Sequence, residues 1–368
     1  MKKFIIVAGA RPNFIKIAPL IACLKKYPSV RPILVHTGQH YDFELSRIFF
    51  RDLDIPEPDI NLNIGSAPYA QQISRIKNAF EKVLLKVKPD LVIVAGDVNS
   101  TLACSMAASR LNIKLAHIEA GLRSFDLTMP EEINRRLTDG LSDYLFVSEK
   151  SGLVNLRNEG IEKEKVFFVG NIMIDALVSN MGKIDRSRIF KQIFADSGVL
   201  PYGVLTLHRP SNVDSKKALL RIVGILKMAC KNIKLIYPMH PRARSMIRKF
   251  KLERVFGSIP DLCVIEPLGY ADFLHLVKYA EFVMTDSGGI QEEATVLKVP
   301  CLTMRKNTER PSTVREGTNV LVGLDKGSIR SCLGKILKDK WKKSKVPALW
   351  DAKTAERICR ILLKADLK

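Results

Sequence analysis

Short runs of apolar and often β-branched residues recur along this 368-residue chain. No other feature of the sequence restricts the set of possible folds as strongly. Twelve such runs lie at residues 4–10, 32–38, 90–97, 114–121, 144–148, 166–171, 203–209, 234–241, 262–269, 282–289, 300–305 and 319–324. Within them apolar residues follow one another instead of alternating with polar ones, as in strands covered on both faces. The stretches between them, such as 12–27 and 70–87, carry apolar residues three and four apart, as amphipathic helices do. The pattern predicts an α/β fold with doubly wound parallel sheets.

The chain is long enough for two domains, because one domain takes roughly 150 residues. The strand–helix pattern reaches residue 171 and restarts at 203, after a polar segment. We therefore expect two Rossmann-like domains, residues 1–171 and 172–350, facing a central cleft. The last helical segment, 351–368, is expected to return to the first domain.

Composition excludes several classes of protein. Apolar residues make up 46% and charged residues 26%, as in folded globular proteins. No apolar run is long enough to span a bilayer, and the N-terminal run breaks at Gly9, so we expect a cytoplasmic protein. The seven cysteines are scattered without a CxxC pair, which indicates reduced core thiols and neither zinc nor disulfides.

The formal net charge of +21 calls for an anionic partner. A nucleic acid, an anionic membrane surface and a phosphorylated small molecule all fit this charge alone. No aromatic-interleaved basic motif or DNA-reading helix stands out, so no nucleic-acid partner is predicted.

Polar residues follow most of the predicted strands. In open parallel sheets, ligands bind beyond the carboxyl ends of strands, where loops meet helix N-termini. The residues that follow the strands in this way are Arg11, His40, Asp97, Glu119, His208, His240 and Ser287.

Ser287, Gly288 and Gly289 stand where a strand turns into a helix. Exposed backbone N–H groups and absent side chains let an anion approach such a turn, which makes it a candidate phosphate site. A plain capped turn explains the same three residues. Glu292 or Glu293, one turn further on, could accept hydrogen bonds from ribose hydroxyls or simply face solvent.

Arg11 and Lys16 stand at the start of the first predicted helix. Cations there oppose the helix dipole, so their placement favours a bound diphosphate or sugar. The glycine pattern is not GxGxxG, which argues against a dinucleotide site in the first domain.

Acidic residues gather after the strand at 114–121. Burying the carboxylate of Glu119 at a strand end is costly without a function. Asp97 either has a function or caps the helix that begins near Ser100. Glu131 and Glu132 follow Pro130, where acids also favour the dipole of a helix start.

His208, beside Arg209, and His240 each end a strand of the second domain. A single histidine there is usually structural, but two at one edge favour a functional role. His36 and His40 have a metal-like spacing, yet they span a strand end and a loop, so no metal site is predicted.

Seven motifs then occur in the order found in one enzyme family. They are GARPNFIK (9–16), HTGQH (36–40), AGDVNST (95–101), HIEAGLRSFDLTMPEEINRR (117–136), LHRPSN (207–212), TDSGGIQEEA (285–294) and MRKNTERPSTV (304–314). Over essentially its whole length, the sequence resembles the non-hydrolysing UDP-N-acetylglucosamine 2-epimerases. The resemblance implies a GT-B-like fold, a homodimer, a UDP-sugar substrate held mainly by the second domain, and no cofactor.

The resemblance also implies roles for individual residues. Asp97, Glu119 and Glu131 would be the acid/base carboxylates, and His208 would lie at the diphosphate. The remaining implied substrate contacts are Arg11, Lys16, Phe273, Ser287, Gly288, Gly289, Glu293 and Arg310. Some members of the family carry a second UDP-sugar site, which here would involve Gln39, Arg209 and His240.

Some features of the sequence do not decide which UDP-sugar is the substrate. Ala10 and Asn13 stand where family members often have Thr and Glu. GARP with HTGQH also resembles epimerases of UDP-diacetamido-uronic acids, whereas NTERP favours the UDP-N-acetylglucosamine branch. A GT-B glycosyltransferase, a hydrolysing epimerase and a non-catalytic nucleic-acid-binding module are the alternatives.

Overall fold

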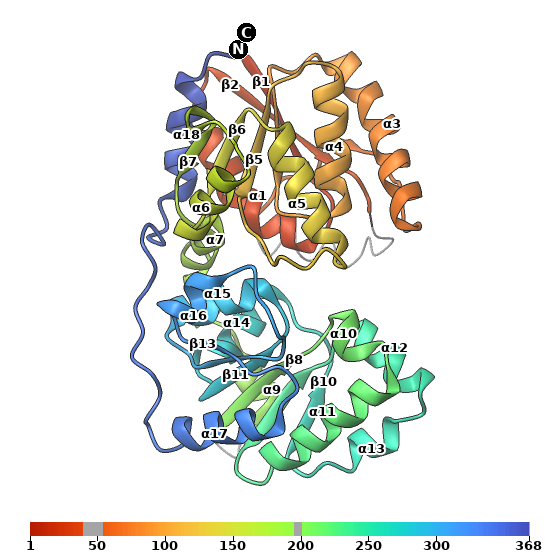
Figure 1. Ribbon diagram of the computed structural model, residues 1–368, viewed down its shortest axis with the longest axis vertical. Helices are drawn as coiled ribbons and strands as arrows, with labels where there is room; N and C mark the ends of the chain where they lie inside the picture. Colours follow the sequence, from red (N-terminus) through yellow and green to blue (C-terminus); the bar gives the residue numbers. More distant parts are fainter. Residues whose placement is uncertain (40–53, 195–200, 368) are drawn as a thin grey trace. The chain divides into compact units, whose positions relative to one another are not determined.

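The computed structural model describes residues 1–39, 54–194 and 201–367, without the side chains of Arg11 and Pro12. The chain forms two compact units (Figure 1): the first is made of Met1–Ser179 and Ala348–Lys368, and the second of Asn180–Pro347. In the described part of the chain, no helix is both long and apolar enough to cross a membrane.

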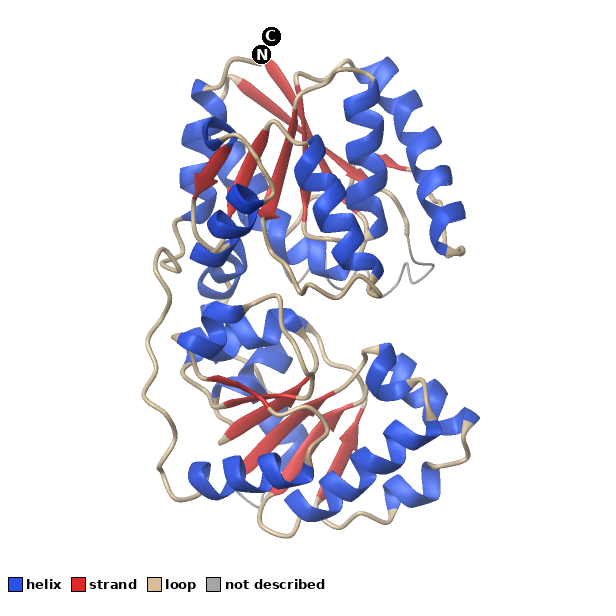
Figure 2. Cartoon of the chain, viewed as in Figure 1, coloured by secondary structure: helices blue, strands red, loops and turns tan. Residues whose placement is uncertain are grey.

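The first unit is built on a parallel sheet of order β3-β2-β1-β4-β5-β6-β7. Its strands are β1 (Lys2–Ala8), β2 (Val30–His36), β3 (Ile60–Asn61), β4 (Leu91–Ala95), β5 (Leu115–Ala120), β6 (Tyr144–Val147) and β7 (Val166–Phe168). Its helices are α1 (Arg11–Leu24), α3 (Tyr69–Val87), α4 (Asn99–Arg110), α5 (Pro130–Leu141), α6 (Lys150–Asn158), α7 (Ile172–Ser179) and α18 (Thr354–Lys364), with a short 3-10 turn at Lys163–Lys165. Helices α1, α7 and α18 cover one face, and α3, α4 and α5 pack side by side on the other (Figure 2).

The second unit repeats this design with a parallel sheet of order β10-β9-β8-β11-β12-β13. Its strands are β8 (Tyr202–Thr206), β9 (Lys234–Pro238), β10 (Leu262–Ile265), β11 (Phe282–Thr285), β12 (Cys301–Thr303) and β13 (Asn319–Leu321). The helices are α8 (Met181–Asp185), α9 (Ile189–Phe194), α10 (Pro210–Val213), α11 (Lys216–Ala229), α12 (Pro241–Lys249), α13 (Glu253–Gly257), α14 (Tyr270–Lys278), α15 (Gly288–Leu297), α16 (Pro311–Arg315) and α17 (Lys326–Ile336). The prediction of two Rossmann-like units is confirmed.

The core strands are buried on both faces, as their continuous apolarity predicts. All five residues of β4 are buried, and so are all six of β5, although β5 contains His117 and Glu119. Separate apolar clusters lie on the two sides of the second sheet, one around Leu226 and Ile329 and the other around Val204 and Val277.

The join between the units falls after Ser179, whereas the sequence places it after Asn171. Helix α7 packs against α1 and α18 and therefore belongs to the first unit. The C-terminal helix α18 is fixed to this unit through Asp175, whose carboxylate accepts hydrogen bonds from the N–H groups of Thr354 (3.2 Å) and Ala355 (2.8 Å).

Candidate active site

Glu119 lies at an irregular point in β5. The pairing of β5 with β6 shifts register between Ile118 and Ala120, and Glu119 takes a left-handed conformation with φ of 70°. Residues other than glycine rarely adopt this conformation unless the surrounding structure holds them there. The side chain of Glu119 is buried, and its Oε2 lies 2.7 Å from Nζ of Lys16 on α1. Since buried charges in proteins are normally paired, this ion pair accounts for the carboxylate.

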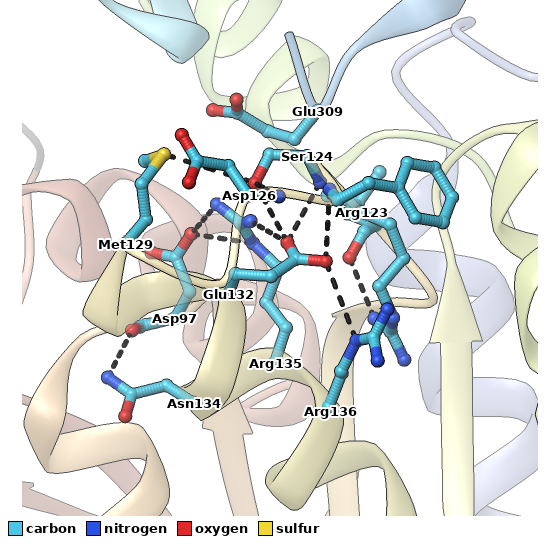
Figure 3. Close-up of polar contacts among 12 residues, drawn as sticks. Asp97, Arg123, Ser124, Asp126, Met129, Glu132, Asn134, Arg135, Arg136 and Glu309 are labelled. Carbon is cyan, nitrogen blue, oxygen red and sulfur yellow. Dashed lines mark hydrogen bonds and ion pairs between the residues drawn. The ribbon is translucent and has the colours of Figure 1, made fainter. Parts of the chain in front are cut away.

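Asp97 follows β4, the strand paired with β5. Its Oδ2 accepts hydrogen bonds from Arg135 on α5, at 3.0 Å from Nε and 2.6 Å from Nη2 (Figure 3). The amide of Asn134 donates to the backbone carbonyl of Asp97 at 2.8 Å. The side chain of Asp97 keeps 26% of its surface exposed, so it is accessible from one side.

Glu132 holds the loop that joins β5 to α5. Its carboxylate accepts the N–H (2.8 Å) and Oγ (3.0 Å) of Ser124 and the N–H of Phe125 (3.2 Å), and it pairs with Arg135 at 2.7 Å (Figure 3). Asp126, in the same loop, accepts hydrogen bonds from the N–H and hydroxyl of Thr128. Two of the clustered acids therefore shape this loop.

Glu131 is half-buried in the first turn of α5. Burial raises the pKa of the Tyr69 phenol, and the charge of Glu131 raises it further, which places the two side chains near each other. The Tyr69 hydroxyl donates to Oδ1 of Asn134 at 2.7 Å. The carboxylates of Asp97, Glu119 and Glu131 thus come from the ends of β4 and β5 and from the start of α5.

The start of α1 is fixed by Asn13. Its Oδ1 accepts the N–H groups of Gly9 (3.1 Å) and Ala10 (3.0 Å), and its Nδ2 donates to the carbonyl of Ala95 (2.7 Å). Asn13 therefore joins β1, α1 and β4. Lys16 comes from this helix, whereas the side chain of Arg11 lies outside the described part of the structure, as does His40.

Gln39 also belongs to the first unit, beyond β2. Its buried Oε1 accepts hydrogen bonds from the N–H (3.2 Å) and Oγ (2.7 Å) of Ser100. These contacts tie the loop after β2 to the start of α4. The structure therefore shows a structural role for Gln39.

In the second unit, His208 is held by Asp286, a buried residue that follows β11. Nδ1 of His208 lies 2.9 Å from Oδ1 of Asp286. The backbone N–H of His208 donates to both carboxylate oxygens, and Oδ2 also accepts hydrogen bonds from the N–H of Arg209 and the amide of Asn212. Burial opposes the charge of Asp286, but His208 and these donors outweigh it and hold the pKa of the carboxyl below its usual range. A third of the His208 side chain stays exposed, and the ring of His240 lies 5.5 Å away, between centroids.

The start of α15 carries Ser287, Gly288 and Gly289. Ser287 makes no side-chain cap, and its backbone N–H donates to Oγ1 of Thr285 at 3.0 Å. A Cβ atom at Gly288 would lie 2.6 Å from Oε1 of Glu309, so only glycine fits there without a shift. Glu309 pairs with Arg305 at 2.9 Å and lies 3.9 Å from Arg209. Arginines and an uncapped helix start therefore meet at the edge of this sheet, a suitable setting for a phosphate group.

The two adjacent glutamates of α15 have different partners. Glu292 forms a buried ion pair with Nε of Arg310 at 2.8 Å. Glu293 accepts a hydrogen bond from the Tyr270 hydroxyl at 2.9 Å, and burial raises the pKa of Glu293 to about 7. Phe273, on the same helix as Tyr270, is half-buried against the core.

Sequence reasoning does not single out the partner residues Arg135, Asn134 and Tyr270. It also does not single out His117 and Asp139, which form a buried contact of 2.6 Å between Nδ1 and Oδ1 next to the backbone of Gly96. All of these except Tyr270 lie inside or just beyond the motif 117–136, and this motif is the signal that could have identified them. Among the described residues, no group of three or more His, Cys, Asp or Glu could hold a metal ion.

Comparisons with known proteins agree along the whole chain. The model of the family described as UDP-N-acetylglucosamine 2-epimerase matches residues 22–363. A UDP-N-acetylglucosamine 2-epimerase of Methanocaldococcus jannaschii is 45% identical over 364 residues, covering 98% of each chain. A crystal structure of the UDP-GlcNAc 2-epimerase from that organism, in complex with UDP-GlcNAc and UDP, matches with a TM-score of 0.92 and 44% identity, covering 99% of this chain and 100% of the other. A UDP-2,3-diacetamido-2,3-dideoxy-D-glucuronate 2-epimerase of Pseudomonas aeruginosa is 40% identical over 352 residues, covering 92% of this chain and 94% of that protein.

Proposed function

The chain belongs to the UDP-N-acetylglucosamine 2-epimerase family, and we propose that it interconverts UDP-N-acetylglucosamine and UDP-N-acetylmannosamine without hydrolysis. The observation that carries this proposal is the placement of Asp97 and Glu119 at the carboxyl ends of paired strands, with Glu131 at the start of the helix that follows. Carboxylates at these points can serve as proton donors and acceptors around one sugar ring.

The chemistry of the substrate explains why more than one acid is needed. The C2 hydrogen of a UDP-N-acetylhexosamine is not next to a carbonyl, so a simple base cannot remove it directly. When the bond from C1 to the diphosphate oxygen breaks, UDP leaves with the bonding electron pair and C1 becomes electron-poor. A carboxylate then takes the C2 proton, and the electrons of the C2–H bond form the C1=C2 bond of 2-acetamidoglucal.

The second half of the reaction reverses these steps on the other face of the ring. A protonated carboxyl delivers its proton to C2 from the opposite side, and the diphosphate oxygen bonds to C1 again. Two proton positions are therefore required, and Asp97, Glu119 and Glu131 are the candidates. A group so placed contributes roughly 100-fold to 10,000-fold to the rate.

The second unit supplies groups that suit the departing UDP. We assign His208, Ser287–Gly289 and Arg310 to the diphosphate, Glu293 to the ribose and Phe273 to the uracil. Cations and backbone N–H groups aimed at the diphosphate stabilise the negative charge that develops as the C1–O bond breaks. Lys16 and Arg11 of the first unit are assigned to the sugar and diphosphate.

The test follows the hydrogen at C2. The purified protein is incubated with UDP-N-acetylglucosamine in heavy water, and the products are examined by NMR. We expect UDP-N-acetylmannosamine with deuterium at C2 and no free N-acetylmannosamine. Retention of the original hydrogen at C2, or transfer of the sugar to an acceptor, would contradict the proposal.

One observation favours a second candidate substrate. The Pseudomonas aeruginosa relative named for a UDP-diacetamido-glucuronate is 40% identical over most of the chain. The same heavy-water experiment with that uronic acid separates the two, because the preferred substrate will show the higher kcat/KM.

We also propose that the protein acts as a homodimer in the cytoplasm. Exposed apolar side chains of the first unit, including Phe125, Leu127 and Leu137, offer surface for a second copy. The cysteines in the described part of the chain are free, as in a reducing compartment. Light scattering on the purified protein measures the oligomeric state.

A further inference from the structure

We propose that His117 and Asp139 are positioning residues that hold the backbone segments of Asp97 and Glu119 in place for proton transfer. This inference rests on the proposed function. Neither residue reaches the edge of the sheet: both side chains are completely buried, His117 in the middle of β5 and Asp139 two turns along α5.

His117 connects the two strands that carry the carboxylates. Its Nδ1 lies 2.6 Å from Oδ1 of Asp139, and its Nε2 lies 2.8 Å from the backbone oxygen of Gly96. Gly96 directly precedes Asp97, and His117 stands two residues before Glu119. One imidazole ring therefore fixes the backbone beside both carboxylates.

Asp139 holds the segment around Glu119 from its other side. Its Oδ2 accepts the N–H of Gly121 at 3.0 Å, two residues after Glu119, and pairs with Nη2 of Arg123 at 2.7 Å. Since Oδ1 faces His117, a single carboxylate contacts the chain both before and after Glu119. Contacts of this kind can maintain the left-handed conformation of Glu119 and the register shift beside it.

The hydrogen bonds also define where the ring carries hydrogen. A backbone carbonyl can only accept hydrogen bonds, so Nε2 of His117 must carry hydrogen, and Nδ1 shares a hydrogen with Oδ1 of Asp139. Burial opposes the charge of Asp139, but His117 and Arg123 outweigh it and keep the pKa of this carboxyl below its usual range. Replacing either residue therefore breaks the link between α5 and the backbone beside Asp97.

The backbone of Gly96, which His117 holds, also lies close to the Lys16–Glu119 ion pair. A Cβ atom at Gly96 would lie 2.6 Å from Nζ of Lys16 and 3.8 Å from Oε2 of Glu119. The backbone of Gly96, held by His117, therefore packs directly against the Lys16–Glu119 pair. A shift of this peptide would displace both Asp97 and Glu119.

The first experiment compares Asp139→Asn and His117→Gln with the wild type. We expect kcat to fall about 100-fold in Asp139→Asn, as for a catalytic group displaced by about 1 Å, while KM and UDP affinity stay within about threefold. His117→Gln keeps one donor for Gly96 and is expected to lose less.

Asp175→Asn is the matched control. Asp175 is another buried carboxylate of the first unit that accepts two backbone N–H groups, but it anchors α18 and not the site. Its substitution is expected to lower stability and leave the kcat of the folded protein unchanged. Unchanged kcat in folded Asp139→Asn, or a loss no greater than in Asp175→Asn, would overturn the proposal.

The second experiment needs no folded variant at Asp139. In protein labelled with ¹⁵N-histidine, the wild-type spectrum should show hydrogen on Nε2 of His117, with the signals assigned by their loss in His117→Gln. A ring without hydrogen on Nε2 would overturn the inference. An inactive wild type would instead refute the proposed function and leave this spectroscopic result to decide the hydrogen-bond network.

Discussion

The two units use similar sheets to present opposite chemistry. In the first unit, cations hold acids at the sheet edge: Lys16 pairs with Glu119 and Arg135 with Asp97. In the second unit, buried acids hold basic side chains: Asp286 pairs with His208 and Glu292 with Arg310. Proton transfer is assigned to the carboxylate of each pair in the first unit, and contact with the diphosphate is assigned to the basic residue of each pair in the second.

Net charge follows the same division. The first unit contains 28 Lys and Arg against 23 Asp and Glu, and the second contains 31 against 15. Most of the formal charge of +21 therefore belongs to the unit to which we assign the diphosphate. The excess needs no nucleic acid as its explanation, because the field of a basic domain attracts any phosphorylated ligand.

The largest expected effect comes from neutralising an acid of the first unit. Glu119→Gln should lower turnover by roughly 100-fold to 10,000-fold, because a proton donor or acceptor is lost, while UDP affinity is unchanged. Asp97→Asn and Glu131→Gln are expected to act in the same way. Turnover by NMR and UDP binding by calorimetry measure the two quantities.

Glu162→Gln serves as the control for this series. Glu162 is an exposed glutamate of the same unit that pairs only with Lys165 in the contacts described here, at 3.2 Å. It should leave both turnover and UDP affinity unchanged. Full activity in all three carboxylate variants would show that the acids of the first unit do not move the protons.

The next effect concerns the acid–cation pair of the second unit. Arg310→Met leaves Glu292 buried without this partner, and losing one member of a buried pair costs about 3–5 kcal/mol. Each unit contains one tryptophan, Trp350 in the first and Trp341 in the second. Denaturation followed by fluorescence in Trp350→Phe and Trp341→Phe backgrounds reports the two units separately.

Only the Trp341 signal should shift to lower denaturant concentration in Arg310→Met. Arg315→Met, at an exposed position of the adjacent α16, should change the free energy of unfolding by no more than about 0.5 kcal/mol. An equal shift of both tryptophan signals would mean that the units unfold as one and that the comparison between them fails.

The third effect is a pH dependence of folding stability that differs between the two units. Burial raises the pKa of Glu293 to about 7 in the folded state, so its protonated form favours folding. This contribution is fully present below the unfolded value of 4.5 and is lost as the pH rises to about 7, a difference of about 3 kcal/mol. Asp139 in the first unit has a lowered pKa, so its contribution is lost in the opposite direction, as the pH falls.

Glu293→Gln isolates this effect from other titrating groups. The Trp341 unfolding free energies of wild type and Glu293→Gln are compared between pH 4.5 and 8. The wild type should lose about 3 kcal/mol relative to the variant across this range. A constant difference would show that Glu293 does not titrate there.

The fold was largely predictable because continuous apolar runs mark buried parallel strands. All twelve predicted runs contain a strand, whereas β3 was missed. This strand has two residues, Ile60 and Asn61, which pair only with the end of β2, so it leaves no periodic signal. Helix α7 was placed beyond the join because its packing on α1 and α18 is a tertiary property.

Site residues were predictable where a polar side chain directly follows a predicted strand. The residues that pair with them were not predictable, because they lie far away in the sequence. Asp97 and Glu119 were found by position, but the pairing of Asp97 with Arg135 spans 38 residues. The left-handed conformation of Glu119 could not be predicted from the sequence either, because a glycine usually marks a position with that conformation. Resemblance supplied the roles of Glu131, Phe273 and Arg310.

The smallest expected effect distinguishes two kinds of helix start within the second unit. Ser215 caps α11, and its Oγ accepts the N–H of Ala218 at 3.1 Å, whereas Ser287 at α15 makes no side-chain cap. Ser215→Ala should therefore cost about 1 kcal/mol of stability, read from Trp341, and leave UDP affinity unchanged. The start of α15, to which we assign the phosphate, has no side-chain cap from Ser287, whereas Ser215 occupies an N–H group at the start of α11. A loss of UDP affinity in Ser215→Ala would mean that ligand binding is spread over both helix starts and not confined to the uncapped one.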